Sequence, residues 1–394
     1  MEFSALIDRI NEPQTILMAK LSRALKSEGV DVVDLSLGEP DFGTPQHIID
    51  AATTAMKDGF TKYPPVAGYP ELRAAVCEKL LRDNKLQYKP EQILISTGAK
   101  QSLANVIQSL INKDDEAIIP TPFWVTYASL VSMNEGVCKF IHCGVDDHFK
   151  LTPEKLEASI TSKTKLFIFS SPCNPSGAVY SYEELLALKS VFDKYPNIVI
   201  ISDEIYEYIN YLGKHESIAQ FDSLKDRVVI VNGFSKGYAM TGWRLGYIAA
   251  PEPIVKACEK MQSQITSGAN SIAQRAGIAA LLGDMQPTQV MLSAFTERKQ
   301  YFINALSEIP GFRVVQPEGA FYAFPDVSYY FGKNIQGQLI DNADDFAMLL
   351  LNKAHVTGVT GVAFGDPNCI RFSFATSMNR LEEAISRIKK FLEN

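Results

Sequence analysis

A single lysine, Lys236, stands among small residues in the stretch NGFSKGYAMTGWR (232–244), directly after the apolar run RVVIV. A lysine amine becomes a nucleophile or a proton carrier when burial or nearby cations lower its pKa. Glycines beside it allow the backbone to approach a ligand closely, and Arg244 offers planar donors for an anion. The ordinary alternative is a solvated loop lysine. The small neighbours and the preceding apolar strand favour a reactive role.

Polar residues follow other apolar runs in the same way. The stretches STGAKQ (96–101), SSPCNP (170–175) and SDE (202–204) each end such a run. Ligands of open α/β sheets collect outside the carboxyl ends of the strands. We therefore expect four strand ends, including that before Lys236, to line one pocket, and the helix after STGAK to offer backbone N–H groups to an anion.

The elements that position these residues are expected to form an α/β protein. Continuous apolar runs predict strands that are buried on both faces, as in a parallel sheet wrapped by helices; they lie at residues 92–96, 116–120, 165–172, 197–204, 227–234 and 245–251. From about residue 286 a long helical segment leads into stretches with more alternation. The predicted fold class is a large lobe with a mostly parallel sheet plus a smaller α+β lobe.

Composition excludes several function classes. The 394 residues are 46% hydrophobic and 21% charged, with a net charge of −7, so clustered basic residues for nucleic acid are not expected. No apolar stretch reaches the length of a membrane span, and the N-terminal residues lack a signal core, which predicts a cytoplasmic location. The six cysteines show no metal-ligand spacing, so we expect reduced, mostly buried thiols and no metal. The glycine fingerprints of nucleotide-binding loops are missing.

Eight motifs occur in order over nearly the whole chain: LSLGEPDFGTP, TKYPPVAGYPELR, STGAKQ, PFWVTY, SSPCNPSGAVY, SDEIYE, NGFSKGYAMTGWRLGY and CIRFSFATS. Together they resemble the fold-type I pyridoxal-phosphate (PLP) enzymes, specifically the class I aminotransferases of the prokaryotic aspartate aminotransferase subgroup. The resemblance implies a PLP-binding large domain at residues 47–285. Residues 1–46 and 286–394 would form a small domain with an N-terminal arm. The resemblance also implies a homodimer with shared active sites.

The resemblance implies the catalytic roles. Lys236 would form the Schiff base with PLP and later shuttle a proton from the substrate Cα. Asp203 would pair with the ring nitrogen and keep it protonated. Asn174 and Tyr206 would hydrogen-bond the phenolic oxygen. From the residues alone, Asp203 could instead cap a helix EIYEYI (204–209), although a charge ending so apolar a strand needs a partner.

Further cofactor contacts follow from the same resemblance. The phosphate would be held by Ser235, Arg244, the backbone around Gly98 and Ala99, and Tyr63, the last reaching in from a second subunit. Trp124 would stack on the pyridine ring. The alternatives are a surface role for the arginine and a simple core role for the tryptophan.

The resemblance also implies which residues bind the substrate. Arg371 would bind the substrate α-carboxylate, with Gly38 adding a backbone contact; Trp124 and Asn174 would also line this site. Within CIRFSFA, Arg371 and Ser373 share one strand face, and a solvent-facing arginine remains the alternative. Lys100 stands where subgroup members for acidic substrates carry a lysine for the distal carboxylate; phosphate contact or solvent exposure are its alternatives.

The expected reaction is transamination between aspartate and 2-oxoglutarate, which yields oxaloacetate and glutamate. The variable N-terminal arm, NEPQTILM (11–18), leaves aromatic or prephenate transamination open, with Ile16 as a lining residue. A β-lyase on the same scaffold is another alternative. A PLP-binding regulator would need a DNA-binding domain, for which the few residues before LSLGEPDF leave no room. A dinucleotide-binding protein would need the missing glycine fingerprint.

Overall fold

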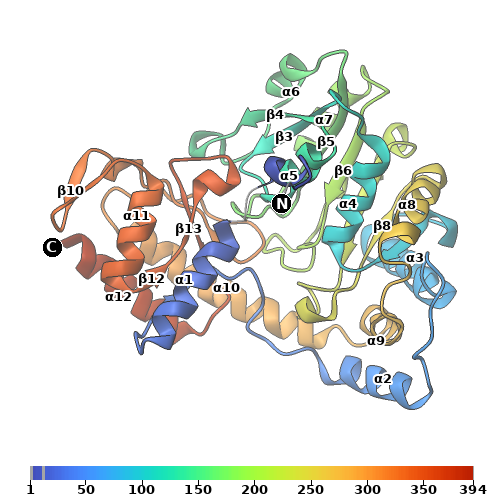
Figure 1. Cartoon of the computed structure of the whole chain (residues 1–394), viewed down its shortest axis with the longest axis horizontal. Helices are drawn as coiled ribbons and strands as arrows, with labels where there is room; N and C mark the ends of the chain where they lie inside the picture. The colour runs from blue at the N-terminus through green and yellow to red at the C-terminus, as the bar shows by residue number, and fades with distance from the viewer. Residues whose placement is uncertain (1–2, 11–13, 394) are drawn as a thin grey trace.

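A seven-stranded sheet forms the centre of the larger lobe in this computed structural model, which describes residues 3–10 and 14–393 (Figure 1). In spatial order the strands are β2 (Ile93–Ser96), β8 (Gly246–Ala249), β7 (Val228–Gly233), β6 (Val199–Asp203), β5 (Thr164–Ser170), β3 (Glu116–Thr121) and β4 (Val137–His142). Neighbouring strands run parallel except around β8, which is antiparallel to both β2 and β7. The mostly parallel α/β fold predicted from the sequence is confirmed, with β8 as the departure from an all-parallel sheet.

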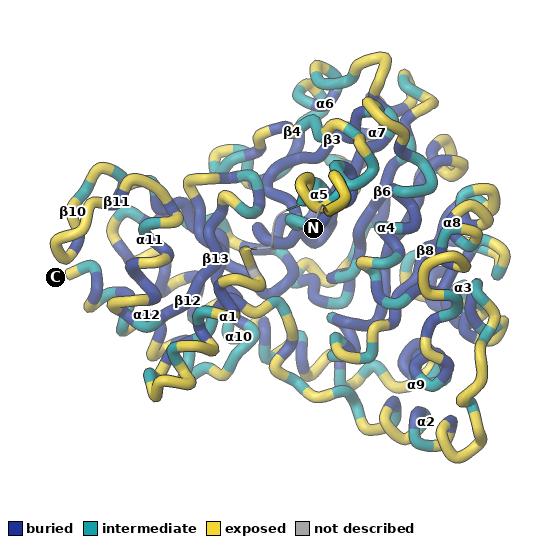
Figure 2. The backbone as a smooth tube through the Cα atoms, viewed as in Figure 1, coloured by how far each residue is buried: buried dark blue, intermediate teal, exposed yellow. Residues whose placement is uncertain are grey.

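Helices cover both faces of this sheet. The helices α2 (Gln46–Lys57), α3 (Pro70–Asn84), α6 (Pro153–Ser159), α7 (Tyr182–Phe192) and α9 (Ser271–Leu282) share a core with one face. The helices α4 (Ala99–Leu110), α5 (Thr126–Met133) and α8 (Glu252–Ile265) share a second core with the other face. Adjacent β6 residues Ile200 and Ile201 enter opposite cores, which explains why this strand reads as a continuous apolar run. Figure 2 shows the buried strands under the more exposed helices.

Strand β4 is the one strand of the large sheet that the apolar runs did not predict. It lies at the edge of the sheet beside β3, and most of its residues are partly or fully exposed. Its sequence VCKFIH therefore mixes polar and apolar residues. An edge strand that is covered on fewer sides lacks the apolar signature of its buried neighbours.

The smaller lobe contains α10 (Gln286–Ser307), β9 (Tyr322–Ala323), β10 (Lys333–Ile335), β11 (Gln338–Ile340), α11 (Ala343–Leu349), β12 (Val356–Thr357), β13 (Val359–Thr360), β14 (Ile370–Ser373) and α12 (Met378–Glu393). From the N-terminal part, α1 (Gln14–Ser27) packs near β13, and β1 (Val33–Asp34) pairs with β12. Strands β13, β14 and β9 form an antiparallel sheet. In Figure 1 this lobe lies at the left, and the long helix α10 runs from it toward α9.

Most of the buried cores follow a similar partition of the chain. One core contains residues from α10 to α12 together with Val33 and Leu35, and also Tyr206 and Ile209 of the larger lobe. A fourth core joins residues of both parts. The predicted division, residues 47–285 against 1–46 and 286–394, is compatible with these cores and stays a prediction. Its second boundary falls at the start of α10.

The structure bears on two further predictions, the burial of the cysteines and the lack of a membrane-spanning segment. All six cysteines are free, and four are buried: Cys143, Cys173, Cys258 and Cys369, so the expectation of mostly buried thiols is confirmed. Within the described part of the chain, no helix is both long and apolar enough to cross a bilayer.

Candidate active site

A pocket of about 410 Å³ lies where the carboxyl ends of the large sheet face the smaller lobe. Residues following β2, β5, β6 and β7 all reach it, together with residues of α1, β9 and β14. The predicted site residues that line it are Gly38, Ala99, Lys100, Trp124, Asn174, Asp203, Tyr206, Ser235, Lys236, Arg244 and Arg371. The structure thus brings the four predicted strand ends together, as expected for an α/β sheet.

Lys236 follows β7, and its side chain reaches into this pocket. Its Nζ donates a hydrogen bond to the carbonyl oxygen of Gly38 and lies 5.7 Å from the centre of the Tyr206 ring. Burial lowers the pKa of the Lys236 amine to about 8, against the opposing charge of Glu39 and with help from Arg371. A solvated loop lysine is therefore the wrong description, and a neutral, nucleophilic amine is accessible at mildly alkaline pH.

Asp203 ends β6 and is buried at the base of the pocket, with 3% of its surface exposed. Tyr127 donates a hydrogen bond of 2.6 Å to Oδ2, and the backbone N–H of Ile205 donates one of 3.2 Å to Oδ1. Burial raises the pKa of this carboxyl to about 6 despite these donors. Residues 205–208 form turns, so the alternative that Asp203 caps a helix is wrong. The carboxylate is instead held facing the pocket.

Tyr206 and Asn174 lie on the side of the pocket that faces the smaller lobe. The hydroxyl groups of Tyr206 and Tyr322 are 2.7 Å apart, and Asn174 Oδ1 accepts a hydrogen bond of 2.9 Å from Arg371 Nη1. Burial raises the pKa of Tyr206 well above its usual range. The phenol is therefore a neutral hydrogen-bond donor at physiological pH.

An anion cradle forms where the turn before α4 meets the loop after β7. Gly98 adopts φ 80° and precedes the first residue of α4, Ala99, so free N–H groups of the first helical turn are available. A Cβ on Gly98 would overlap the guanidinium group of Arg244. Buried Ser235 lines the same region. The cradle combines helix N–H donors, a hydroxyl group and a guanidinium, which suits a phosphate.

Arg371 enters from β14 and is 2% exposed, so the solvent-facing alternative is wrong. Its Nη2 donates 2.7 Å to the carbonyl oxygen of Ser36, and its Nε has no hydrogen-bond partner among the described residues. Burial lowers its pKa from the usual value. This guanidinium donates hydrogen bonds to two neutral groups, the Asn174 amide and the Ser36 carbonyl. A buried cation with neutral partners favours the binding of an anion from outside the chain.

Lys100 and Trp124 form the outer wall. The Lys100 ammonium lies 5.0 Å from the centre of the Trp124 ring, and Trp124 meets Tyr127 edge to face at 5.7 Å. Burial, with the charge of Arg244, lowers the pKa of Lys100. Lys100 lines the pocket but is itself exposed, so its role with the distal carboxylate stays a prediction beside the alternatives of phosphate contact and solvent exposure.

Gly98 is not among the lining residues but adjoins two that are, Ala99 and Arg244. Tyr63 is the predicted site residue that lies apart from this pocket. Its side chain is 96% exposed, and the part of the pocket built by this chain does not include it. A role within the same chain is therefore not supported, and its contribution from a second subunit stays a prediction. Of the arm NEPQTILM, residues 11–13 lie outside the described residues, whereas Ile16 lines the pocket.

Several lining residues were missed by the sequence analysis. Tyr127 bonds Asp203, Tyr322 bonds Tyr206, and Arg23 on α1 reaches the pocket rim. Tyr127 closes the quoted motif PFWVTY, three residues after Trp124, and this short spacing was an available signal. Tyr322 and Arg23 come from distant parts of the chain, and no local pattern marks them.

The fold and this pocket define an α/β enzyme with a buried reactive amine opposite a buried carboxylate. The sequence matches the family model described as aminotransferase class I and II over residues 30–388, and the chain belongs to this family. The aspartate/prephenate aminotransferase of Nitrosomonas europaea is 45% identical, with 100% of both chains covered. The aspartate aminotransferase of Bacillus subtilis is 44% identical, covering 100% of this chain and 99% of its own. The crystal structure of the Rhizobium meliloti aspartate aminotransferase superposes with a TM-score of 0.97 at 40% identity, covering 100% and 99%. The protein is an aminotransferase.

Proposed function

We propose that this aminotransferase binds PLP and transfers the amino group of aspartate to 2-oxoglutarate. The observation that carries the proposal is the juxtaposition of Lys236, with its pKa lowered to about 8, and Asp203 in one pocket with Arg371, whose buried Nε is unpartnered. An amine, a carboxylate and a guanidinium are the groups that this reaction requires. The names of the relatives, aspartate and aspartate/prephenate aminotransferase, support the same substrate.

The residues present fit PLP. Ser235, Arg244 and the N–H groups at the start of α4 would hold its phosphate, and Trp124 would cover its ring. Asp203 would face the ring nitrogen, and Tyr206 and Asn174 the phenolic oxygen. When bound, PLP supplies an aldehyde that takes up an amino group and a cationic ring that draws electrons from the substrate Cα. The chain itself supplies binding, orientation and proton transfer.

In this proposal each of the main site residues has one task. Arg371 binds the substrate α-carboxylate through guanidinium N–H groups that include the unpartnered Nε, and Asn174, which accepts from Nη1, fixes the guanidinium orientation. Lys100 meets the distal carboxylate, so the two cations set the direction of the Cα–H bond. Lys236 then removes the Cα proton. Asp203 holds a proton on the ring nitrogen by its negative charge.

A test of the substrate uses initial rates with aspartate, phenylalanine, prephenate and cystathionine, each at matched concentrations. Aspartate should give the highest kcat/KM, with oxaloacetate as product in the presence of 2-oxoglutarate. Lys100→Ala should lower kcat/KM for aspartate by about 10- to 100-fold, the loss of one charge-assisted contact, and leave phenylalanine nearly unchanged. An unchanged preference for aspartate in this variant would remove Lys100 from the proposal.

A second candidate is transamination of prephenate or an aromatic amino acid. Ile16 on α1 and the neighbouring Leu37 line the pocket and are 43% and 41% exposed. Apolar side chains at the rim suit a ring, and one relative is named for prephenate as well as aspartate. Equal kcat/KM for prephenate and aspartate in the same assay would favour a dual activity.

We further propose a homodimer in which Tyr63 of one subunit reaches the phosphate site of the other. The high exposure of this tyrosine in the single chain supports the idea. A cytoplasmic location remains a prediction.

A further inference from the structure

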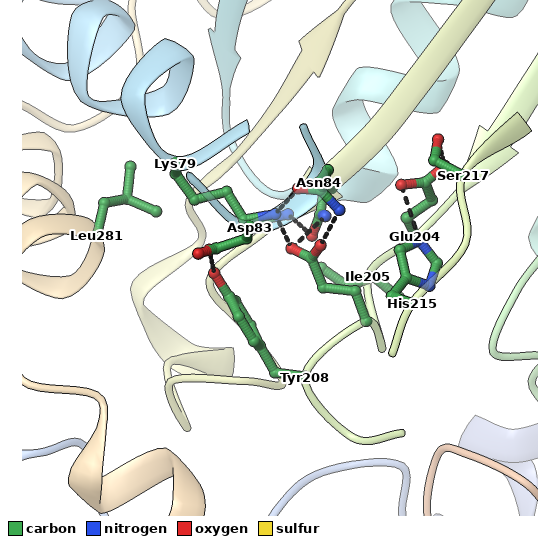
Figure 3. Close-up of polar contacts among 12 residues, drawn as sticks. Lys79, Asp83, Asn84, Glu204, Ile205, Tyr208, His215, Ser217 and Leu281 are labelled. Atoms are coloured by element: carbon green, nitrogen blue, oxygen red, sulfur yellow. Dashed lines mark hydrogen bonds and ion pairs between the residues drawn. The ribbon is translucent and has the colours of Figure 1, made fainter. Parts of the chain in front are cut away.

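A buried polar cluster joins α3 to the turn after β6 and to the end of β7, and Figure 3 shows its Lys79 and Asn84. We call it the Glu207 cluster; its members are Lys79, Asn84, Glu207 and Asn232. Lys79 Nζ donates to Glu207 Oε1, with side chains 1% and 4% exposed. Asn232 Nδ2 donates 2.8 Å to the same Oε1, and Asn84 Nδ2 donates 3.0 Å to Oε2. The carboxylate is therefore satisfied by three donors from two parts of the chain, Lys79 and Asn84 on α3 and Asn232 on β7.

A metal site is the first alternative for this region. Glu204, Glu207 and His215 can offer ligand atoms within 4.8 Å of one another. However, His215 and Ser217 already donate to Glu204 at 3.0 and 2.6 Å, and Lys79 supplies the positive charge beside Glu207. A cation entering here would have to displace the ammonium group, so the donors favour a self-contained cluster.

The position of Glu207 in the chain connects the cluster to the reacting groups. Glu207 directly follows Tyr206 and stands four residues after Asp203, whereas Asn232 stands four residues before Lys236. The hydrogen bond between Glu207 and Asn232 therefore connects the turn that follows Asp203 to β7, the strand that precedes Lys236. Strands β6 and β7 run parallel and adjacent, so a shift at either end changes the separation of the reacting groups.

A second contact holds the chain on the other side of Lys236. The Tyr208 ring packs against Gly237, where an added Cβ would come 2.6 Å from Tyr208 Cδ2. Tyr208 donates a hydrogen bond of 2.6 Å to Asp83 on α3. Lys236 is thus bracketed by Asn232 before it and Gly237 after it, and both positions are held by the segment that follows β6.

Stability alone does not explain a buried ion pair. Removing two charges from water costs several kcal/mol, and an apolar pair of similar size is often as stable. Directional charged hydrogen bonds, in contrast, define one geometry. We propose that Glu207 is a positioning residue that fixes the Lys236 amine relative to Asp203 and Tyr206. This inference rests on the proposed function.

The test compares holoenzymes of the wild type, Asn232→Ala and the charge-neutral double variant Lys79→Met/Glu207→Gln. The first readout is the pH midpoint of the visible absorbance of PLP bound at Lys236; the second is kcat and KM for aspartate. A displaced amine should move the midpoint by about half a unit or more. The value of kcat should fall about 10- to 100-fold with a smaller change in KM.

Glu116→Gln is the matched control. Glu116 is also a buried carboxylate, 8% exposed, and accepts a hydrogen bond of 2.6 Å from Thr161, but it lies on β3, away from Lys236. It should lower the melting temperature without moving the absorbance midpoint. If the cluster variants behave like this control, the positioning role is wrong. Should the double variant fail to fold, the milder Asn232→Ala decides by the same criterion.

The same measurements separate this inference from the proposed function. A wild type that binds PLP and shows a pH-dependent band but does not use aspartate overturns the substrate, while the midpoints still test Glu207. A wild type that acquires no visible band with PLP overturns both.

Discussion

Burial tunes the two ionisable groups at the centre of the pocket in opposite directions. It lowers the pKa of Lys236 to about 8 and raises that of Asp203 to about 6. Both shifts have the same cause, because a charge loses hydration in a buried site. Each group is thereby brought closer to neutral than it would be in water. The chain therefore gives up some stability at these positions, and we expect a bound cofactor to recover it.

Replacing the amine should abolish catalysis without disturbing the fold. For Lys236→Ala we expect kcat for aspartate to fall by about 1,000-fold or more, because the variant loses both its nucleophile and its proton carrier. Steady-state rates and circular dichroism provide the measurement. Lys57→Ala, a change of an exposed lysine on α2, is the control and should keep wild-type rates. Substantial residual activity in Lys236→Ala would argue against the assigned role.

Removing the buried charge should stabilise the apoprotein while impairing the enzyme. The folded pKa of Asp203 is raised above 3.8, so the folded state binds more protons than the unfolded state between pH 3.8 and about 6. Stability is therefore lost as the pH rises through this window, and the cost is full above it. Asp203→Asn should raise the free energy of unfolding at pH 7 by about 1–3 kcal/mol.

Thermal melts of the two apoproteins across the pH range check this. The difference should shrink toward pH 4, where the wild-type carboxyl is also neutral, and transamination by the variant should be much slower at pH 7. A variant that is less stable than the wild type at every pH would contradict the sign of the effect.

At the scale of elements, the pocket depends on where turns leave the large sheet. Strands β5, β6 and β7 run parallel, so Asn174, Asp203 and Lys236 follow strand ends at one edge. The turn before α4 joins them because β2 runs in the same direction as β7, both being antiparallel to β8. A local change in one of these turns should therefore act on the cofactor rather than on the fold.

Gly98→Ala tests the turn before α4. The new Cβ would meet the Arg244 guanidinium, and φ 80° is itself strained for alanine. We expect PLP to bind about tenfold more weakly or worse, because a strain of about 1–3 kcal/mol falls on the cradle. Absorbance titration of the apoprotein with PLP gives the dissociation constant.

Gly59→Ala is the matched control for this variant. Gly59 has φ 78° with open space around the position of a Cβ, so it shares the positive φ but lies in the turn after α2. It should lower stability and leave the PLP affinity unchanged. Equal affinities in Gly98→Ala and Gly59→Ala would show that the turn does not hold the phosphate.

At the scale of the whole molecule, two lobes meet at the pocket and each supplies part of it. The larger lobe provides Lys236 and Asp203, whereas β14 of the smaller lobe provides Arg371. Helix α1 adds Ile16 and Arg23 at the rim. In the proposed dimer, Tyr63 of a second subunit would complete the phosphate site.

Mixed dimers test the shared site. Lys236→Ala and Tyr63→Ala homodimers should each be strongly impaired. When both chains are coexpressed with different tags and the mixed dimer is isolated, one site contains the wild-type Lys236 and receives the wild-type Tyr63 from the Lys236→Ala chain. That dimer should recover up to about half of the wild-type activity, because one of two sites is intact. No recovery above the Tyr63→Ala homodimer would mean that Tyr63 does not act across the interface.

The sequence by itself determined most strands of the large lobe and the residues whose types could perform chemistry. Continuous apolar runs are intrinsic to strands covered on both faces, so β2, β3, β5, β6, β7 and β8 were predictable and the exposed edge strand β4 was not. Polar groups directly after buried strands marked Lys236 and Asp203, whereas Arg371 was marked by the family resemblance of its motif.

Tertiary structure decided how these residues meet. The hydrogen bonds of Asp203 with Tyr127 and of Tyr206 with Tyr322 join distant segments, and the Glu207 cluster joins three. The protonation of Lys236 and Asp203 also depends on burial, which no local spacing specifies. Such contacts arise from packing between elements, whereas periodicity reports only the environment of each element along its own length.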